Sequence, residues 1–441
     1  MTDDLSLIAE QIAADYSERA LWVAYSGGVD SHVLLHLLAS SDQIDSSRIH
    51  AIHIDHGLQA DSQDWAKHCQ QIAGGLKIDF HCVRVAVNDI PQLGLEAAAR
   101  NARYQAIADT VPAGDVVLTA QHQEDQAETL LLQLLRGAGV KGLSAMAAAF
   151  SLEGKQVVRP LLAISQAAIE DYAERHALSW VEDPSNADTK LNRNYLRKNV
   201  LPSVVARWPS AAKSLSRSAS YCAEADVLLS ELAALDLQTM GVDVSARQLS
   251  VQALLGLSPA RARNVIRTVL AELRLAMPSA MMLERILNEL CLAADDKMPL
   301  VAWANVEVRR YRDTLYFLWP ELAQDKTEQH LCYGPETVLL SDDRQLTWLD
   351  VDKVGISDAL FKQGLRLGFR QGSEAIQLVG HGHHKSLKQL YQEWAIPPWE
   401  RNRIPLLFSG DELLAVVGYG FSEQCVLSPG QKGYLPLIKT R

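Results

Sequence analysis

The hexapeptide Ser26-Gly27-Gly28-Val29-Asp30-Ser31 constrains the fold of this chain more than any other segment. The apolar residues 20–25 before it predict a buried strand, and the leucine-rich residues 32–38 after it predict a helix. A glycine-rich turn from a strand into a helix directs backbone N–H groups and the positive helix end toward phosphate oxygens. Two glycines let that backbone approach an anion without an intervening Cβ. The segment therefore predicts a phosphate-binding turn in an α/β domain.

The side chains of this turn also suit a phosphate group. Ser26 and Ser31 carry hydroxyls that can donate hydrogen bonds. Asp30 would contact a phosphate favourably only through an intervening Mg²⁺ ion, so we predict it as a catalytic residue and magnesium ligand. The predicted ligand-binding residues of the turn, on this phosphate chemistry, are Ser26, Gly27, Gly28, Val29, Asp30 and Ser31. The alternative is a glycine turn that only joins a strand to a helix.

The hexapeptide closely resembles the pyrophosphate-binding loop of the N-type ATP pyrophosphatases, the PP-loop superfamily. Those enzymes cleave ATP between the α and β phosphates, transfer AMP to a substrate oxygen and release pyrophosphate. The Walker sequence GxxxxGK[ST], which serves γ-phosphate chemistry, does not occur in this chain. The resemblance therefore implies ATP as cosubstrate and adenylation as the reaction, rather than kinase or ATPase chemistry.

Composition limits the class of protein. The 441 residues predict two to four domains, and a hydrophobic content of 48% suffices for packed cores. No segment approaches the run of about 18 apolar residues expected of a membrane helix, and the acidic N-terminal segment predicts no signal peptide. The six cysteines form no CxxC pair, so they suggest neither a structural zinc site nor an iron–sulfur cluster. We predict a cytoplasmic protein with reduced thiols and no membrane partner.

Residues 1–215 predict a doubly wound, mostly parallel α/β domain, because short apolar segments alternate with helical patterns. The predicted strands are 20–25, 49–54, 80–87 and 116–120. The predicted helices are 64–73, 95–110 and 125–136. Residues 216–330 predict a mainly helical domain, with helices in 221–237, 259–273 and 280–292 and an extended segment at 306–319. Residues 331–441 predict a small α+β domain, with strands at 365–370, 404–408 and 413–417 and a helix at 386–394.

Ligands of such sheets bind beyond the carboxyl ends of the strands, so the loops there should hold the site. His53 and His56 follow the second predicted strand, where they could stack on adenine or hydrogen-bond its edge. His122 follows the fourth strand, and we also assign it to ATP. Asp125 and Glu128 share a helix face if a helix begins near residue 124, and two carboxylates there can hold Mg²⁺ or receive a cation. Acids in a first helical turn also stabilise the helix dipole, which is the alternative.

Basic residues stand out locally against the net charge of −11. Residues 189–217 hold seven lysines and arginines with no acid, and residues 360–403 hold seven against three glutamates. Both tracts could neutralise the phosphates of a polyanion, although either could equally be a solvated helix face. Arg100 and Arg103, on a predicted helix, could balance triphosphate charge, with surface ion pairing as their alternative. The predicted RNA-binding residues are Arg193, Arg197, Lys198, Lys385 and Lys388.

Taken together, the motifs resemble the tRNA(Ile)-lysidine synthetase family over almost the whole chain. The matching segments, in the family's order, are HIDHGL (53–58), EAAARNARY (96–104), DQAETLLLQLLRG (125–137), RPLL (159–162), DPSNAD (183–188), NRNYLR (192–197) and GHGHHKSLKQLYQEWAIPPWERNRIPLLF (380–408). The chain departs from the family at Glu124-Asp125, where two adjacent aspartates are usual. The extra methylene bears on any metal role of Glu124 and leaves Asp125 and Glu128 undisturbed.

The resemblance implies that ATP adenylates C2–O of the wobble cytidine in the CAU anticodon of tRNA(Ile), and that L-lysine then displaces AMP to give lysidine. Asp125 and Glu128 are the residues predicted to bind the cationic lysine. The second and third domains are predicted to bind tRNA, and a homodimer is compatible with the sequence, which does not fix the oligomeric state.

Three other functions are alternatives for this sequence. A tRNA thiolation enzyme of the same superfamily typically needs paired or catalytic cysteines, and no CxxC pair occurs. GMP and asparagine synthetases need a glutamine-hydrolysing section, for which the first 20 residues leave no room. A non-catalytic tRNA-binding protein on a degenerate nucleotide fold would not need an intact SGGVDS turn. Pyrophosphate release that depends on tRNA would distinguish an enzyme from a binder.

Overall fold

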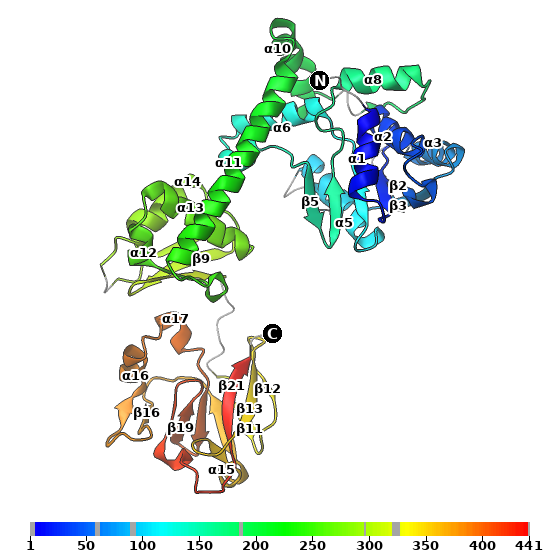
Figure 1. Cartoon of the computed structure of the whole chain (residues 1–441). Coiled ribbons are helices and arrows are strands. Elements are labelled where there is room, and N and C mark those ends of the chain that lie inside the picture. The colour runs from blue at the N-terminus through cyan, green and yellow to red at the C-terminus, as the bar shows by residue number, and fades with distance from the viewer. Residues whose placement is uncertain are drawn as a thin grey trace. The chain divides into compact units, whose positions relative to one another are not determined.

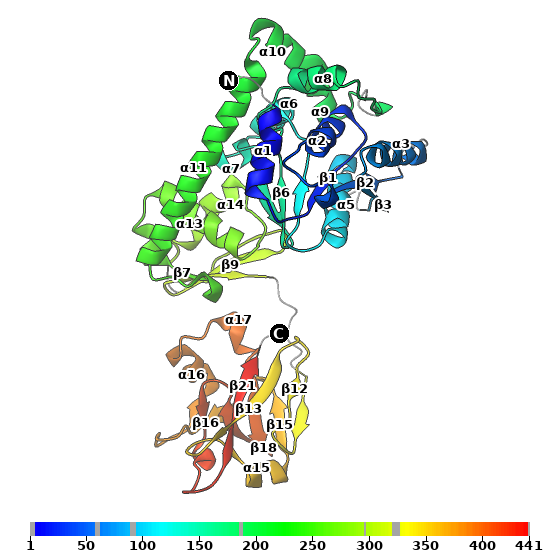
Figure 2. The same cartoon turned by 45° about the vertical axis from the view of Figure 1, so that its right-hand side comes forward.

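The computed structural model describes residues 5–57, 62–88, 94–184, 188–294, 297–319 and 327–439 (Figures 1 and 2). The chain forms two compact units, Met1–Leu232 and Ala233–Arg441. Leu58 of the HIDHGL motif and residues 185–187 of the DPSNAD motif lie outside the described residues. Within the described part of the chain, no helix is long and apolar enough to cross a membrane.

A six-stranded sheet forms the centre of the first unit, in the order β3-β2-β1-β4-β6-β5. Its strands are β1 (Leu21–Ala24), β2 (Ile49–Asp55), β3 (Asp79–Arg84), β4 (Val116–Leu118), β5 (Ala149–Leu152) and β6 (Lys155–Val158). Neighbouring strands pair in parallel except β5, which is antiparallel to β6. The predicted mostly parallel sheet is confirmed, and the β5–β6 hairpin is an addition that the sequence analysis did not predict.

Apolar residues cover both faces of this sheet, as expected of a doubly wound domain. Successive residues of β1 point to opposite faces, so Leu21 and Val23 join one core while Trp22 joins the other. The larger core is formed with helices α1, α2, α3 and α8, and the smaller one with α5. The helices of this unit are α1 (Ser6–Asp15), α2 (Val29–Ala39), α3 (Ser62–Gly75), α5 (Leu95–Thr110), α6 (Gln123–Leu135), α7 (Val140–Leu143), α8 (Gln166–Arg175), α9 (Asn192–Tyr195), the π-helix η3 (Leu196–Val200) and α10 (Leu201–Arg207).

The long helix α11 (Ala211–Thr239) spans the boundary between the two units in the sequence. It is followed by α12 (Val251–Leu255), α13 (Pro259–Glu272), α14 (Ala280–Arg285) and the π-helix η5 (Ile286–Leu290). An antiparallel sheet of order β7-β10-β9-β8 packs with them, made of β7 (Gln248–Ser250), β8 (Leu300–Trp303), β9 (Val306–Tyr311) and β10 (Thr314–Leu318). The middle part of the chain is therefore mainly helical, as predicted, and its helices share one core with this sheet.

The last part of the chain is a small α+β region, as predicted. It holds a five-stranded sheet, β11-β15-β18-β19-β20, and a four-stranded sheet, β12-β13-β21-β14. Its main elements are β11 (His330–Cys332), β13 (Gln345–Val351), α15 (Asp358–Gln363), β15 (Leu365–Gly368), α16 (Leu387–Glu393), α17 (Pro398–Arg401), β18 (Leu406–Ser409), β19 (Glu412–Val416) and β21 (Gly433–Lys439). Domain boundaries at residues 215 and 330 stay predictions.

Candidate active site

Two cavities lie at the carboxyl ends of the central parallel strands, where the predicted loops meet. The smaller, of about 160 Å³, is lined by Ser26, Asp30, Ser31 and Asp125, among others. The larger, of about 400 Å³, is lined by residues that follow β2, including His53 and His56. Ser26 and Arg103 line both cavities. The loops after β1, β2 and β4 thus converge on one continuous region, as the topology requires.

The hexapeptide has the backbone of a tight anion-binding turn. Gly27 has a φ of +89°, and a Cβ built there would lie 2.8 Å from Sγ of Cys69. Only glycine satisfies both conditions without strain. The Ser31 hydroxyl donates to the Gly28 carbonyl at 3.0 Å, and the Ser26 N–H donates to the Ser31 hydroxyl at 3.2 Å. The serines therefore hold the loop in shape at the start of α2.

Gly27→Ala is expected to lower the free energy of unfolding by about 2 kcal/mol, since left-handed backbone and a close contact must both be accommodated. Gly28→Ala is the matched control, because a Cβ at Gly28 would meet its nearest atom, Oγ of Ser26, at an ordinary 3.6 Å. We expect Gly28→Ala to keep its stability but to weaken ATP binding. Urea unfolding and calorimetric ATP titration measure the two effects, and equal stabilities would contradict the strain argument.

Asp30 presents an unsatisfied carboxylate oxygen at the smaller cavity. Its Oδ1 atom is buried without a hydrogen-bond partner, and its side chain is 35% exposed. Its Oδ2 atom lies 3.9 Å from Nε2 of His122. Burial raises the pKa of Asp30, and the nearby His122 charge opposes that rise. A lone carboxylate oxygen facing a loop built for phosphate fits a hard cation such as Mg²⁺.

His122 is buried among three carboxylates and does not face the nucleotide cavities directly. Its Nδ1 atom lies 3.0 Å from Glu124, and its Nε2 atom lies 3.4 Å from Asp125. Glu124 also accepts a hydrogen bond of 2.8 Å from the N–H of Gln166. Glu124 is therefore occupied by protein donors, which removes the metal role left open by its extra methylene. His122 contacts Asp30 and Asp125 and lines neither cavity, and its contact with ATP stays a prediction.

Asp125 and Glu128 share one face of α6, as their spacing predicts, but arginines already occupy that face. Arg197 contacts Asp125 at 2.8 Å through Nη2 and Glu128 at 2.6 Å through Nε. Arg193 lies 3.3 Å from Glu128 and donates to the Thr129 hydroxyl at 2.8 Å. The side chain of Glu128 is fully buried. Arg193 and Arg197, predicted as RNA ligands on an exposed surface, instead pair with the acids of the site.

The larger cavity is lined by histidines with free ring nitrogens. Nδ1 of His53 donates to the Tyr25 carbonyl at 2.9 Å, which leaves its Nε2 as an acceptor. Both ring nitrogens of His56 are buried without hydrogen-bond partners. Burial lowers the pKa of both histidines, so each is neutral near pH 7. Trp65 and Leu95 add apolar walls, and neutral donors and acceptors beside such walls suit a purine base.

Arg103 rather than Arg100 lies at the cavities. Arg103 lines both, whereas the guanidinium of Arg100 lies over the Tyr104 ring at 5.4 Å from its centroid. The two arginines are three apart on α5, and spacing alone did not decide which one would point inward. The catalytic role of Arg100 stays a prediction, and Arg103 of the same EAAARNARY motif is the arginine that lines the cavities.

Comparison with known proteins adds the family. A PP-loop domain matches residues 1–204, a TilS substrate binding domain matches 249–316, and a TilS substrate C-terminal domain matches 365–437. The tRNA(Ile)-lysidine synthase of Coxiella burnetii is 43% identical over 91% of this chain and 89% of its own length. The chain belongs to the tRNA(Ile)-lysidine synthase family. Family members of the same name from Yersinia pseudotuberculosis (strain IP 31758) and Legionella pneumophila (strain Paris) are 41% and 38% identical, over 91% and 95% of both chains.

Among the site residues of this family member, His122 makes stability depend on pH. Burial alone would lower its pKa, but the hydrogen bond with Glu124 and the charges of Asp125 and Asp30 raise it to about 9. Because the ordinary value is 6.5, the stabilisation is complete below pH 6.5 and is lost as pH rises through about 9. The shift corresponds to roughly 3 kcal/mol.

We therefore expect the stability difference between wild type and His122→Asn to shrink by roughly 3 kcal/mol between pH 6 and pH 10. Denaturant unfolding of both proteins across that range measures it. Other titrating groups are common to the two proteins, so they cancel in the difference. A difference that stays constant with pH would show that His122 is not held as the imidazolium.

Proposed function

We propose that this chain ligates L-lysine to C2 of the wobble cytidine in the CAU anticodon of tRNA(Ile), through an adenylated cytidine, with release of AMP and pyrophosphate. The observation that carries the proposal is one cavity lined by both the hexapeptide loop and Asp125. The related chains named above are tRNA(Ile)-lysidine synthases, which agrees with this chemistry. A cytoplasmic location and a homodimer stay predictions.

The loop and its neighbours would bind ATP with the triphosphate at the start of α2. Backbone N–H groups of the turn and the positive end of α2 face the anion. Bound Mg²⁺, held by Asp30, would neutralise phosphate charge and make pyrophosphate a better leaving group. Arg103, which lines both cavities, would add a positive charge between the phosphates and the base. Nε2 of His53 would accept a hydrogen bond from the adenine amino group.

The reaction consists of two substitutions. The cytosine C2 oxygen attacks the α phosphorus, the bond to the bridging oxygen breaks, and pyrophosphate leaves. The lysine Nζ then attacks C2, the C2–O bond breaks, and AMP leaves with that oxygen. Lysine is an ammonium ion until it loses a proton, so a carboxylate at the site would bind it before the attack. We assign this role to Asp125.

The ion pairs of Asp125 and Glu128 distinguish the two residues predicted to bind lysine. Asp125 lines the smaller cavity, whereas Glu128 is fully buried against Arg197 and Arg193. Asp125 shares Arg197 with Glu128 and His122 with Asp30 and Glu124, so these cations balance its charge only in part. A cationic amine would complete that balance. We therefore assign the lysine contact to Asp125 and give Glu128 the task of orienting Arg197.

The tRNA contacts rest on the exposed members of the basic tracts. Lys198 and Lys388 are exposed, while Lys385 is paired with Glu393 at 2.9 Å. Exposed aromatic rings accompany the first tract, with Tyr195 51% and Trp208 61% accessible. Unpaired bases of an anticodon loop stack on such rings. We propose that the region around Lys198 contacts the anticodon loop.

We expect Lys198→Gln and Lys388→Gln each to weaken tRNA binding and to reduce the slope of log K against log salt by about 0.7–0.9. ATP affinity should not change, because neither lysine lines a nucleotide cavity described above. Lys67→Gln is the control, since Lys67 is an exposed lysine paired with Asp64 on α3. Titrations of tRNA binding against salt concentration test this prediction. Slopes equal to that of the control would show that neither lysine contacts tRNA phosphates.

Pyrophosphate release tests the proposed enzyme against a tRNA-binding protein. With ATP and Mg²⁺, we expect release to require a tRNA whose wobble base is cytidine, even when lysine is omitted. A tRNA(Ile) transcript with uridine at that position serves as the control. Release that is independent of tRNA, or equal for both transcripts, would contradict the proposal.

A further inference from the structure

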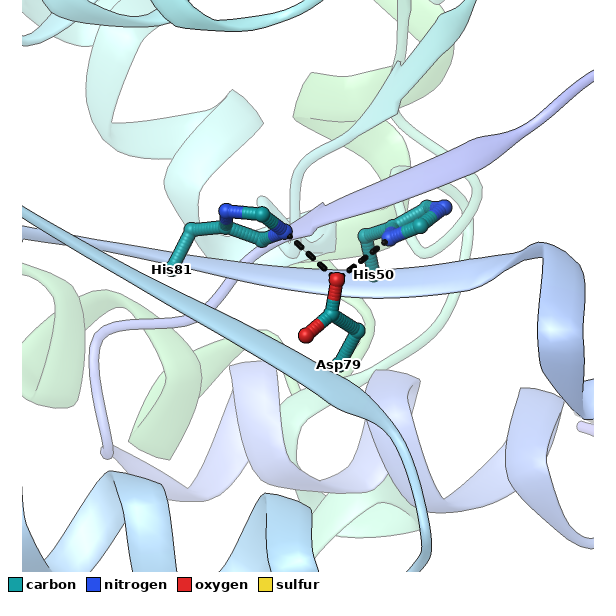
Figure 3. Close-up of side chains that lie close together, drawn as sticks. All are labelled: His50, Asp79 and His81. Atoms are coloured by element: carbon teal, nitrogen blue, oxygen red, sulfur yellow. Dashed lines mark hydrogen bonds and ion pairs between the residues drawn. The ribbon is translucent and has the colours of Figure 1, made fainter.

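A second group of ligand-type side chains lies away from the nucleotide cavities, on strands β2 and β3. It consists of His50, Asp79 and His81 (Figure 3). Among the residues that the structure describes, this is the group in which three His, Cys, Asp or Glu residues bring ligand atoms within 4.8 Å of one another. Nε2 of His81 lies 3.0 Å from Oδ2 of Asp79, and Nδ1 of His50 lies 3.5 Å from the same oxygen. Neither the adenylation chemistry nor the RNA contacts use these residues.

The strand register creates this cluster. His50 is paired directly with Asp79 in the parallel ladder, and His81 lies two residues further along β3 on the same face as Asp79. All three therefore sit near the amino ends of the strands, whereas the hexapeptide follows the carboxyl end of β1. Ile52, the first residue of β2 that lines the larger cavity, lies two residues beyond His50, which is about 7 Å along the strand.

Neighbouring groups fix the orientation of the histidines. The Trp22 ring stacks on His50 at 4.6 Å and lies 4.7 Å from His81, between ring centroids. Trp22 is itself fixed by a 2.9 Å hydrogen bond from its indole N–H to Asp115. Nδ1 of His50 is buried and makes no hydrogen bond. A buried ring nitrogen that lies near a carboxylate and makes no hydrogen bond is an unsatisfied polar atom, which a bound metal ion would satisfy.

We propose that His50, Asp79 and His81 bind a zinc ion that clips the edge strand β3 to β2. Zinc–nitrogen bonds of about 2.0–2.1 Å place tetrahedral donors about 3.3 Å apart, close to the 3.0 and 3.5 Å observed here. Two imidazoles and one carboxylate suit Zn²⁺ and do not suit Mg²⁺, which requires oxygen ligands. The carboxylate is 66% exposed, so water can enter and take the fourth position.

Zinc binding would require one ring proton of His81 to change position. His81 now shares a hydrogen bond with Asp79 through Nε2, and coordination through that nitrogen requires the ring proton to move to Nδ1. The edge strand β3 is paired only with β2 within the sheet order. A metal bridge between these strands would therefore stabilise the folded protein by mass action.

The test must account for the exposed histidines of the GHGHHK loop, because His381, His383 and His384 could also take up Zn²⁺. We would replace those three with alanine in the full chain and titrate this background protein with ZnCl₂ by calorimetry. We expect one zinc ion per chain, a higher unfolding temperature with zinc, and the strong visible absorption of four-coordinate cobalt after Co²⁺ substitution.

Asp79→Asn and His81→Ala in that background should each lower zinc affinity more than tenfold, since a ligand is lost in each case. His176→Ala, which removes an exposed histidine of α8's C-terminal cap, should leave the affinity unchanged. Asp79→Asn should also release pyrophosphate at the wild-type rate, which separates this site from the proposed reaction. No saturable zinc uptake by the background protein, or equal uptake by Asp79→Asn, would overturn the proposal.

Discussion

Asp30→Asn is expected to lower the rate of tRNA-dependent pyrophosphate release about a thousandfold. The reason is the unpartnered Oδ1 atom beside the phosphate loop, where a carboxylate can hold Mg²⁺ and an amide cannot. Burial raises the pKa of Asp30, so the fold gains little from its negative charge. The neutral, similarly shaped asparagine should therefore leave the protein folded. Steady-state pyrophosphate assays at saturating tRNA measure the loss.

Asp64→Asn is the matched control for this substitution. Asp64 is an exposed aspartate on α3 that pairs with Lys67, and it lines neither cavity described above. It should retain full activity. Thermal unfolding of both variants confirms that the comparison is made between folded proteins. Near-normal pyrophosphate release by folded Asp30→Asn would remove Asp30 from the proposed magnesium site.

Asp125→Asn and Glu128→Gln are expected to fail in different ways. Asp125→Asn should raise the lysine concentration needed for half-maximal ligation by about 10–100-fold, because a charge-assisted contact with the ammonium group is lost. The corresponding ATP concentration should change little. Glu128→Gln should instead destabilise the fold by about 2 kcal/mol, because Arg197 and Arg193 lose a fully buried carboxylate partner, although Asp125 still pairs with Arg197.

A double substitution separates the two roles. Glu128→Gln combined with Arg197→Met removes the guanidinium together with the carboxylate, so it should recover part of the lost stability. Lysine saturation curves for the single variants complete the comparison. If Asp125→Asn impaired ATP saturation and left lysine saturation unchanged, Asp125 would belong to the metal site rather than to the lysine-binding site.

The sequence predicted those elements whose patterns are long or sharply bounded. The helix predicted at residues 95–110 coincides with α5, and the four predicted strands of the first domain are β1 to β4. The strands β5, β6, β7 and β8 are as short as β1 and β4, but they lack the continuous run of buried apolar residues that marks those two strands. These strands pair through tertiary contacts, and local propensity does not reveal them.

The sequence predicts that the loops of the site meet at one edge of the sheet, but it does not predict which side chains pair there. Parallel strands bring their carboxyl ends to one edge, so the loops holding Asp30, His53 and Asp125 had to meet. The i, i+4 spacing of Arg193 and Arg197 places them on one face, but it does not say whether that face meets solvent or an acidic helix. Their ion pairs join residues more than sixty positions apart, which no local pattern encodes.

The most direct test of the proposed function is the fate of lysine. The protein is incubated with ATP, Mg²⁺, isotope-labelled lysine and tRNA(Ile) bearing a CAU anticodon, and the tRNA is then digested to nucleosides. We predict that the label appears in the wobble nucleoside, one lysine per tRNA, and that omitting ATP abolishes it. A wobble cytidine recovered unmodified by active, folded protein, or label attached elsewhere in the tRNA, would contradict the account.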